Sequence, residues 1–211
     1  LNGGVATVTG CRFCANVAHA DTDGNSIGGF VRGGAIHVQS VPQLLVADCL
    51  FFTNLVYGDL ASTHLGDAIS VAGATTGAIR RCVLVGNGSP WAGNDGQIDI
   101  EGGTVGITNV LVAQGVYGSA IRHTGGELTL NHCTLADNAA GWGLYGLTVT
   151  AQVWNSIAWA NSLGGFSNAA VTYSDSQEIQ VGDGNKNMDP VFADTNYYHL
   201  SSKHGYYADG Y

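Results

Sequence analysis

The stretch "NHCTLADN" at residues 131–138 sets a cysteine, a leucine and an asparagine at fixed intervals in a short apolar segment. Closely similar phrases occur elsewhere along the chain. Aligned on the last position, the six phrases are "CRFCAN" (11–16), "CLFFTN" (49–54), "CVLVGN" (82–87), "VLVAQG" (110–115), "CTLADN" (133–138) and "SIAWAN" (156–161). Because their starts are separated by 38, 33, 28, 23 and 23 residues, the chain is built from a repeat.

Two further short strands accompany the phrases. One opens on glycine and alternates apolar with polar residues, as in "GGAIHV" (33–38), "GDAISV" (66–71), "GQIDI" (96–100), "GSAIRH" (118–123) and the weaker "GLYGLTV" (143–149). The other is an apolar run such as "LLVAD" or "LTLNH" between that segment and the next phrase. Three short strands per repeat of about 23 residues predict a right-handed parallel β-helix, because a propeller blade needs four longer strands and no leucine-rich consensus is present.

In such a stack the first and third positions of each phrase point inward and form continuous internal files. The first file contains Cys11, Cys49, Cys82, Val110, Cys133 and Ser156, and the second contains Phe13, Phe51, Leu84, Val112, Leu135 and Ala158. The final asparagines are expected at a corner, in the left-handed conformation, with side-chain amides that bond the backbone of adjacent coils. These asparagines are Asn16, Asn54, Asn87, Asn138 and Asn161.

The composition favours a soluble chain with a buried core: 45% of the 211 residues are apolar and 11% are charged. A net charge of −9 makes nucleic acid and anionic membranes poor partners. Glycine is frequent, with 32 residues against 3 prolines, which favours many tight turns over Pro-rich linkers. We expect about six coils over residues 1–165 and a less regular closing segment over 166–211 of the same domain.

The first residues, "LNGGVATVTG", lack a charged stretch followed by an apolar run, and no segment approaches the ~20 apolar residues of a membrane span. Since the chain begins inside a repeat, we interpret it as a fragment or processed product whose earlier coils are missing.

The phrases resemble the C-x-F-x-x-N type coils of right-handed parallel β-helix repeat proteins found among bacterial secreted and surface proteins. The late segments "NSIAWANS" (155–162), "VTYSDSQ" (171–177), "GNKNMDPVFAD" (184–194) and "YYHL" (197–200) resemble the closing region of large repeat proteins with a choice-of-anchor Q type end. In those relatives a Ser-Pro-x-x-Asp-x-Gly element follows, whereas this chain stops at "YYADGY". The resemblance implies a fold and an extracellular or cell-surface location, but it extends to adhesins, passenger domains and polysaccharide-active enzymes alike.

The segment "CRFC" is a C-x-x-C, yet it has neither the helix N-terminus of a redox motif nor the second ligand pair of a zinc site. We therefore expect the cysteines of the first file to be buried, reduced thiols that pack as small hydrophobes.

Three long connectors, 17–33, 55–65 and 88–95, leave the stack at one corner and should project side by side. Their polar and aromatic residues suit a carbohydrate-binding surface, although long connectors can also be tolerated decoration. The candidate ligand-binding residues are His19, Tyr57, His64, Trp91, Asn94 and Asp95.

Within the first connector, "DTDGN" spaces Asp21, Asp23 and Asn25 as oxygen ligands around a glycine bend, a pattern that suits Ca²⁺. It lacks the downstream glutamate of an EF-hand, so an Asx-rich turn is the alternative. No other cofactor is indicated.

The glycine-opened strands also place His37, Ser70, Asp99, Arg122 and Tyr145 in one outward column. Carboxylate, guanidinium and imidazole on neighbouring rungs are the groups that a polysaccharide lyase or glycoside hydrolase uses, which makes Asp99, Arg122 and His37 the candidate catalytic residues. The alternative is that Asp99 and Arg122 form a cross-strand ion pair.

Aromatic residues gather late in the chain, and we expect them to close the C-terminal end of the stack or, alternatively, to form a sugar platform. They include Trp142, Trp154, Trp159, Tyr197, Tyr198, Tyr206, Tyr207 and Tyr211.

Three functions follow. The first is a non-catalytic extracellular or cell-surface module of a larger bacterial protein, displaying loops for adhesion or carbohydrate binding. The second is a polysaccharide lyase or glycoside hydrolase, and the third is a structural spacer in a fibre or stalk. The sequence gives neither the ligand nor the oligomeric state.

Overall fold

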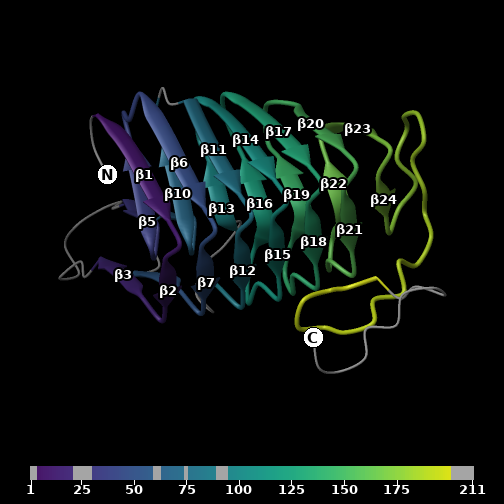
Figure 1. The fold of residues 1–211 in the computed structure, drawn as a ribbon, viewed down its shortest axis with the longest axis horizontal. Helices are drawn as coiled ribbons and strands as arrows, with labels where there is room; N and C mark the ends of the chain where they lie inside the picture. Colours follow the sequence, from purple (N-terminus) through teal and green to yellow (C-terminus); the bar gives the residue numbers. More distant parts are fainter. Residues whose placement is uncertain (1–3, 21–29, 59–62, 74–75, 89–94, 201–211) are drawn as a thin grey trace.

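The computed structural model describes residues 4–20, 30–58, 63–73, 76–88 and 95–200. Over these ranges the chain is all-β, with three long parallel sheets and no helix. None of the described residues therefore forms a helix that could span a bilayer. The sheets run the length of the stack in Figure 1.

Each sheet collects one strand from every coil. Sheet A contains β5 (Ile36–Gln39), β10 (Ile69–Ala72), β13 (Gly96–Ile100), β16 (Ser119–His123), β19 (Trp142–Gly146) and β22 (Gly164–Ser167). Sheet B contains β1 (Val5–Thr9), β6 (Gln43–Ala47), β11 (Thr76–Arg80), β14 (Thr104–Thr108), β17 (Glu127–Asn131), β20 (Ala151–Trp154) and β23 (Ala169–Thr172). Sheet C contains β2 (Arg12–Cys14), β7 (Leu50–Phe52), β12 (Val83–Val85), β15 (Leu111–Ala113), β18 (Thr134–Ala136), β21 (Ile157–Trp159) and β24 (Asp175–Ser176).

The chain visits sheets B, C and A in turn, and every strand pairs in parallel with the strand one coil away. The expected all-β, parallel, repeat-built solenoid is thereby confirmed. Sheets B and C continue past residue 165 through β23 and β24.

Alternation along the short strands decides what is buried. In the second phrase Cys49 and Phe51 are fully buried, whereas Leu50 between them is exposed, as expected for a strand with one face inward. Residues from all three sheets meet in one hydrophobic cluster, which includes Ile69, Val46 and Phe51. The core therefore lies between the three sheets and runs along the stack.

The cysteine file has the predicted register. Pairing of the residues that follow aligns Cys11, Cys49, Cys82, Val110, Cys133 and Ser156, and extends the file to Ser174. All five cysteines are free thiols, and burial raises the pKa of Cys82 and of Cys133 to about 11. The predicted burial is wrong for Cys11, which is exposed because β2 is the end strand of sheet C.

The asparagine file is a chain of buried amides. The N–H and Nδ2 of Asn54 both donate to Oδ1 of Asn87, at 2.9 Å each. Asn138 donates in the same way to Oδ1 of Asn161, at 3.2 and 2.7 Å. Each buried amide thus satisfies the backbone and side chain of the preceding coil, which is the requirement for polar groups without access to water.

The prediction that these asparagines adopt the left-handed conformation is wrong, because the residue with positive φ lies one position earlier. The corner residues before the file are Ala15, Thr53, Gly86, Gln114, Asp137 and Ala160. A second left-handed corner precedes the cysteine file, at Gly10, Asp48, Arg81, Asn109, His132, Asn155 and Tyr173. The asparagine side chain fills the corner, and the preceding residue makes the bend.

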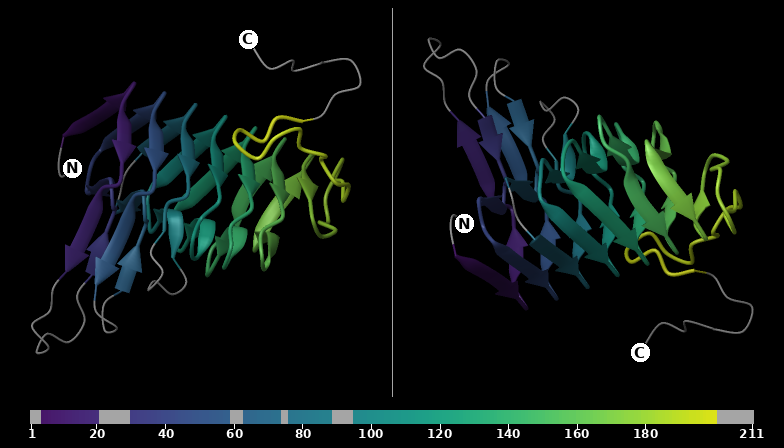
Figure 2. Two further views of the ribbon diagram at one scale, coloured as in Figure 1. Left: turned by 90° about the horizontal axis from the view of Figure 1, so that it is seen from below. Right: turned by 90° about the horizontal axis from the view of Figure 1, so that it is seen from above.

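The first two coils carry an arm outside the three sheets. In it β3 (Val17–Ala20) pairs with β8 (Leu55–Gly58), and β4 (Phe30–Arg32) pairs with β9 (Thr63–Leu65). Figure 2 shows these purple and blue strands projecting from the same corner of the stack. The prediction that the first two connectors lie side by side is confirmed for their described strands.

Among the described residues, none of the aromatic residues expected to close the end belongs to the hydrophobic core. Tyr198 packs on Ala113 and Ala136 at the outer face of sheet C, with Phe192 edge-on at 5.1 Å. Figure 1 shows this yellow segment folding back along the side of the stack near β18. Trp142, Trp154 and Trp159 lie on β19, β20 and β21, one in each sheet, and so do not cluster. Tyr206, Tyr207 and Tyr211 lie outside the described residues.

Candidate functional site

The outer column of sheet A has the predicted composition. Pairing between neighbouring strands aligns His37, Ser70, Asp99, Arg122 and Tyr145. Nδ1 of His37 lies 3.2 Å from Oγ of Ser70, and Nη1 of Arg122 donates to Oδ2 of Asp99 at 2.8 Å. The structure therefore brings together the three candidate catalytic residues in one file.

The column is not exposed as expected, because Ser70 and Asp99 are fully buried. Burial raises the pKa of Asp99 to about 6, against the opposing effect of the Arg122 guanidinium. Oδ1 of Asp99 has no hydrogen-bond partner among the described residues. A carboxyl group enclosed in this way has no solvent-facing oxygen for a polymer to contact.

An ion pair joins the arm to this face two coils away. Nε and Nη2 of Arg32 donate to the two carboxylate oxygens of Glu101, at 3.0 and 2.7 Å. Burial and the Arg32 charge both lower the pKa of His37. His37 is consequently neutral near pH 7 and suited to hydrogen bonding.

The arm brings together two of the predicted ligand-binding residues. The ring of His19 stacks on that of Tyr57, with centroids 4.9 Å apart and an interplanar angle of 25°. Both side chains are exposed, so this pair is a small aromatic surface. Trp91 and Asn94 lie outside the described residues, as do Asp21, Asp23 and Asn25 of the expected calcium loop.

The other two predicted ligand-binding residues are buried. His64 has its pKa lowered by burial. Asp95 has its pKa raised to about 8, first by burial and then by the nearby carboxylates of Asp67 and Asp99. The expectation that His64 and Asp95 are displayed to a ligand is therefore wrong in this arrangement.

A pocket of ≈ 130 Å³ lies farther along the outer face of sheet A. Trp142 and Tyr145 from β19 form its aromatic walls, and Oγ of Ser119 accepts a hydrogen bond from the backbone N–H of Trp142 at 3.1 Å. The indole passes over Gly164, where an added Cβ would lie 2.2 Å from the Trp142 ring. The glycine thus makes room for the indole. The remaining lining residues are Gly118, Ala140, Gly141 and Leu163.

Sequence reasoning assigned Trp142 to closure of the end and missed this pocket. The two-residue period of a strand places side chains three residues apart on opposite faces, so the pattern gave no signal that Trp142 and Tyr145 line one pocket.

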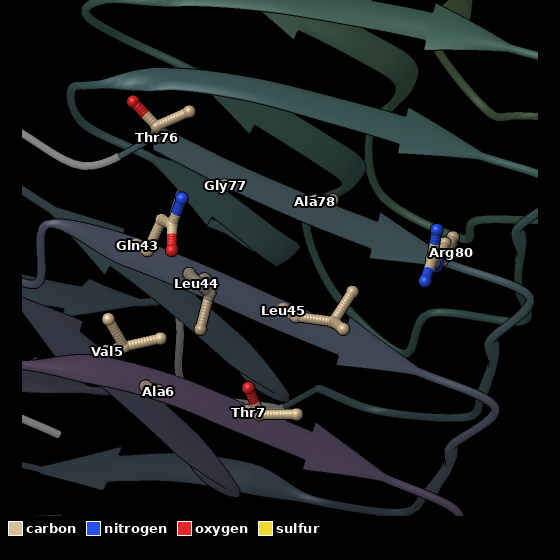
Figure 3. Close-up of a pocket in the computed structure, with 10 residues that line it drawn as sticks. All are labelled: Val5, Ala6, Thr7, Gln43, Leu44, Leu45, Thr76, Gly77, Ala78 and Arg80. Atoms are coloured by element: carbon tan, nitrogen blue, oxygen red, sulfur yellow. The ribbon is translucent and has the colours of Figure 1, made fainter.

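A second pocket, of ≈ 390 Å³, lies on sheet B at the first coils (Figure 3). Apart from the Gln43 amide, its walls are small, apolar or hydroxyl-bearing, and Arg80 is its charged residue. It is lined by Val5, Ala6, Thr7, Gln43, Leu44, Leu45, Thr76, Gly77, Ala78 and Arg80. The described lining contains no acid, histidine or thiol.

Among the residues that the structure describes, no group of three or more His, Cys, Asp or Glu side chains is arranged to hold a metal ion.

Comparison of the chain with protein-family models, with curated proteins and with solved structures found no match.

Proposed function

We propose that this chain is a non-catalytic carbohydrate-binding module, built as a right-handed parallel β-helix within a larger bacterial surface or secreted protein. The pocket between Trp142 and Tyr145 carries the proposal. The right hand is supported by the general rule that about 98% of crossovers between parallel strands of one sheet are right-handed. The resemblance of the repeated phrases supports the location.

The pocket has the composition that sugars require. Aromatic side chains offer a broad apolar surface together with polar edges, and a few hydrogen-bonding groups then fix orientation. Tyr117 and Leu163 are exposed at or near the rim, with 40% and 60% of their surface accessible. The pocket is small and partly open, so it fits one sugar ring of a longer chain. The His19–Tyr57 pair offers a second aromatic contact on the same molecule.

Burial of Asp99 argues against the enzymatic alternative. A glycoside hydrolase needs two carboxyl groups that reach the scissile bond, and a general acid or base must approach its proton to hydrogen-bond distance. The pKa of about 6 for Asp99, beside Arg122, is the observation that favours a lyase or hydrolase. Asp99→Asn separates the two functions: loss of sugar release from a panel of neutral and uronic-acid polymers would establish catalysis.

The proposal is tested by screening the chain on a glycan array and titrating the best binder by calorimetry. Trp142→Ala should weaken binding by about ten-fold or more, since removal of one stacked aromatic removes about 1.4 kcal/mol or more. Trp159→Ala, a half-buried tryptophan on sheet C, is the matched control and should leave affinity unchanged. Equal affinity of both variants, or binding of no glycan at all, contradicts the proposal and leaves the spacer function.

A further inference from the structure

Among the residues that the structure describes, none covers the core at the end formed by the first coil. Strands β1, β2 and β5 are the end strands of sheets B, C and A. Side chains from all three, including Val8, Phe13 and Ile36, line an opening of ≈ 240 Å³. Backbone groups along these edges and apolar walls between them make the end suited to strand addition.

The opposite end is already closed by hydrogen bonds. The Glu178 carboxylate accepts from the N–H groups of Gly165 and Phe166 in β22, at 2.8–2.9 Å. Next to β24, the N–H of Lys186 donates to the Ser174 carbonyl, and the N–H of Ser176 donates to the Lys186 carbonyl. The two ends of the stack are therefore chemically different.

The hydrogen bonds of the asparagine file all run in one direction, so they determine whether the open end presents donors or acceptors. Each amide donates to the following coil and accepts, at Oδ1, from the preceding one. Asn16 donates from its N–H and Nδ2 to Oδ1 of Asn54, at 3.1 and 2.7 Å. No described residue donates to Oδ1 of Asn16, which is exposed. The file ends there in an acceptor.

We propose that the first coil is a docking surface for one further β-coil of the same repeat type, added in parallel, whose corner asparagine donates to Oδ1 of Asn16. Apolar residues at its inward positions would fill the opening beside Phe13. If a second copy docked through its own first coil, the Oδ1 acceptors of the two Asn16 residues would face each other with no donor between them. If it docked through its C-terminal end, the contacts that Glu178 makes there would have to be displaced. The polarity of the file therefore selects a parallel coil over a second copy.

The test compares the chain with an extended chain that carries one more coil. The added coil is a copy of residues 126–148 joined directly to Gly4. It should pair with the first coil in register, because the strand pairings from β1 through β6, β11 and β14 to β17 place Val5 at the same position as Glu127. Backbone amides of β1 and β2 should then exchange with deuterium about ten-fold more slowly. In the control extension the inward Leu128, Leu130 and Leu135 of the copy are replaced by serine, and exchange should match that of the unextended chain.

Asn16→Ala tests the polarity. It should lower the melting temperature of the extended chain more than that of the unextended chain, where it removes only the hydrogen bond from Asn16 Nδ2 to Asn54 Oδ1. Exchange of β1 and β2 that is equal in the extended and control chains would overturn the proposal. An equal effect of Asn16→Ala in both backgrounds would overturn it too. Sedimentation of the unextended chain as a dimer with protected β1 amides would identify a second copy as the occupant instead.

Discussion

Gln97 bridges a gap that the repeated phrase itself leaves. The fourth phrase has Gly115 where the others have asparagine. Gln97, from β13 of sheet A, accepts from Asn87 Nδ2 at 2.8 Å and donates to Asn138 Oδ1 at 2.9 Å. One glutamine thus keeps the buried amide chain continuous through a coil that lacks its own asparagine.

Gln97→Ala should lower the free energy of unfolding by about 2–4 kcal/mol. It removes the acceptor of the buried Asn87 Nδ2 group and one of the donors to Asn138 Oδ1, and a buried polar group without its partner is costly. Denaturant unfolding measures the change. Gln152→Ala, on an exposed position of β20, is the control and should change stability by less than about 0.5 kcal/mol. A loss equal to that of the control would mean that the amide chain contributes little.

A compensating change follows from the same contacts. A Cβ at Gly115 would lie 2.7 Å from Asn138 Oδ1 and 3.0 Å from Gln97 Nε2, so Gly115→Asn alone should destabilise the chain. Combined with Gln97→Ala, it restores the phrase used by the other coils and should recover more than half of the stability lost. A double variant that is less stable than either single variant would show that the two sites are not alternatives.

Asp95 predicts a dependence of stability on pH. Its pKa rises from 3.8 to about 8 on folding, so the folded chain retains a proton that the unfolded chain releases. The stability linked to this proton is complete below pH 3.8 and is lost as the pH rises toward 8. Asp95→Asn should therefore raise the melting temperature at pH 8 more than at pH 5, whereas Asp183→Asn, at an exposed position, should not. An unchanged pH profile would refute a buried, protonated Asp95.

Which outward residues become buried could not be predicted from the sequence. The two-residue period of a strand assigns His37, Asp99 and Arg122 to one face, and that assignment holds. This face also carries contacts between distant segments, such as the Arg32–Glu101 ion pair across 69 residues, whose charges act on Asp99. No local pattern encodes such a contact.

The backbone conformation at the corners between strands was likewise only partly predictable from the sequence. Strand positions follow from alternation, but the left-handed corner is occupied by residues as different as Ala15, Thr53 and Asp137. Because their side chains share no chemistry, their type gave no signal, whereas the asparagine beside them did. The repeat therefore predicts where a coil bends and leaves open which residue bends.

Thr53→Gly should stabilise the chain by about 1 kcal/mol, since a β-branched residue is strained at its φ of 52° and glycine is not. Gly86 holds the equivalent corner one coil later, with a φ of 65°. Thr134→Gly, inside β18, is the control and should destabilise by about 1 kcal/mol. Both values are measured by denaturant unfolding, and a destabilising Thr53→Gly would mean that the threonine side chain contributes more than its strain.

The whole molecule is a row of coils that mainly contact their neighbours. Its period, its parallel register and its internal files followed from six aligned phrases, because each coil adds one layer to a shared core. The polar contacts at the C-terminal end did not follow, since the described residues there use single polar side chains such as Glu178, whose role no repeated pattern indicates. Tyr198 instead packs on the side of sheet C, where its hydroxyl donates to Asp137 at 2.6 Å.

Glu178→Ala tests whether damage at one end stays local. Removing the carboxylate frees the N–H groups of Gly165 and Phe166, so their deuterium exchange should accelerate by about ten-fold or more. In a solenoid the effect should decline from coil to coil, leaving exchange in β5 and β10 unchanged. Glu127→Ala, which removes an exposed carboxylate from sheet B, should alter neither end. Faster exchange along the entire stack would instead show that the coils unfold as one cooperative unit, and the row of separable layers would no longer describe the molecule.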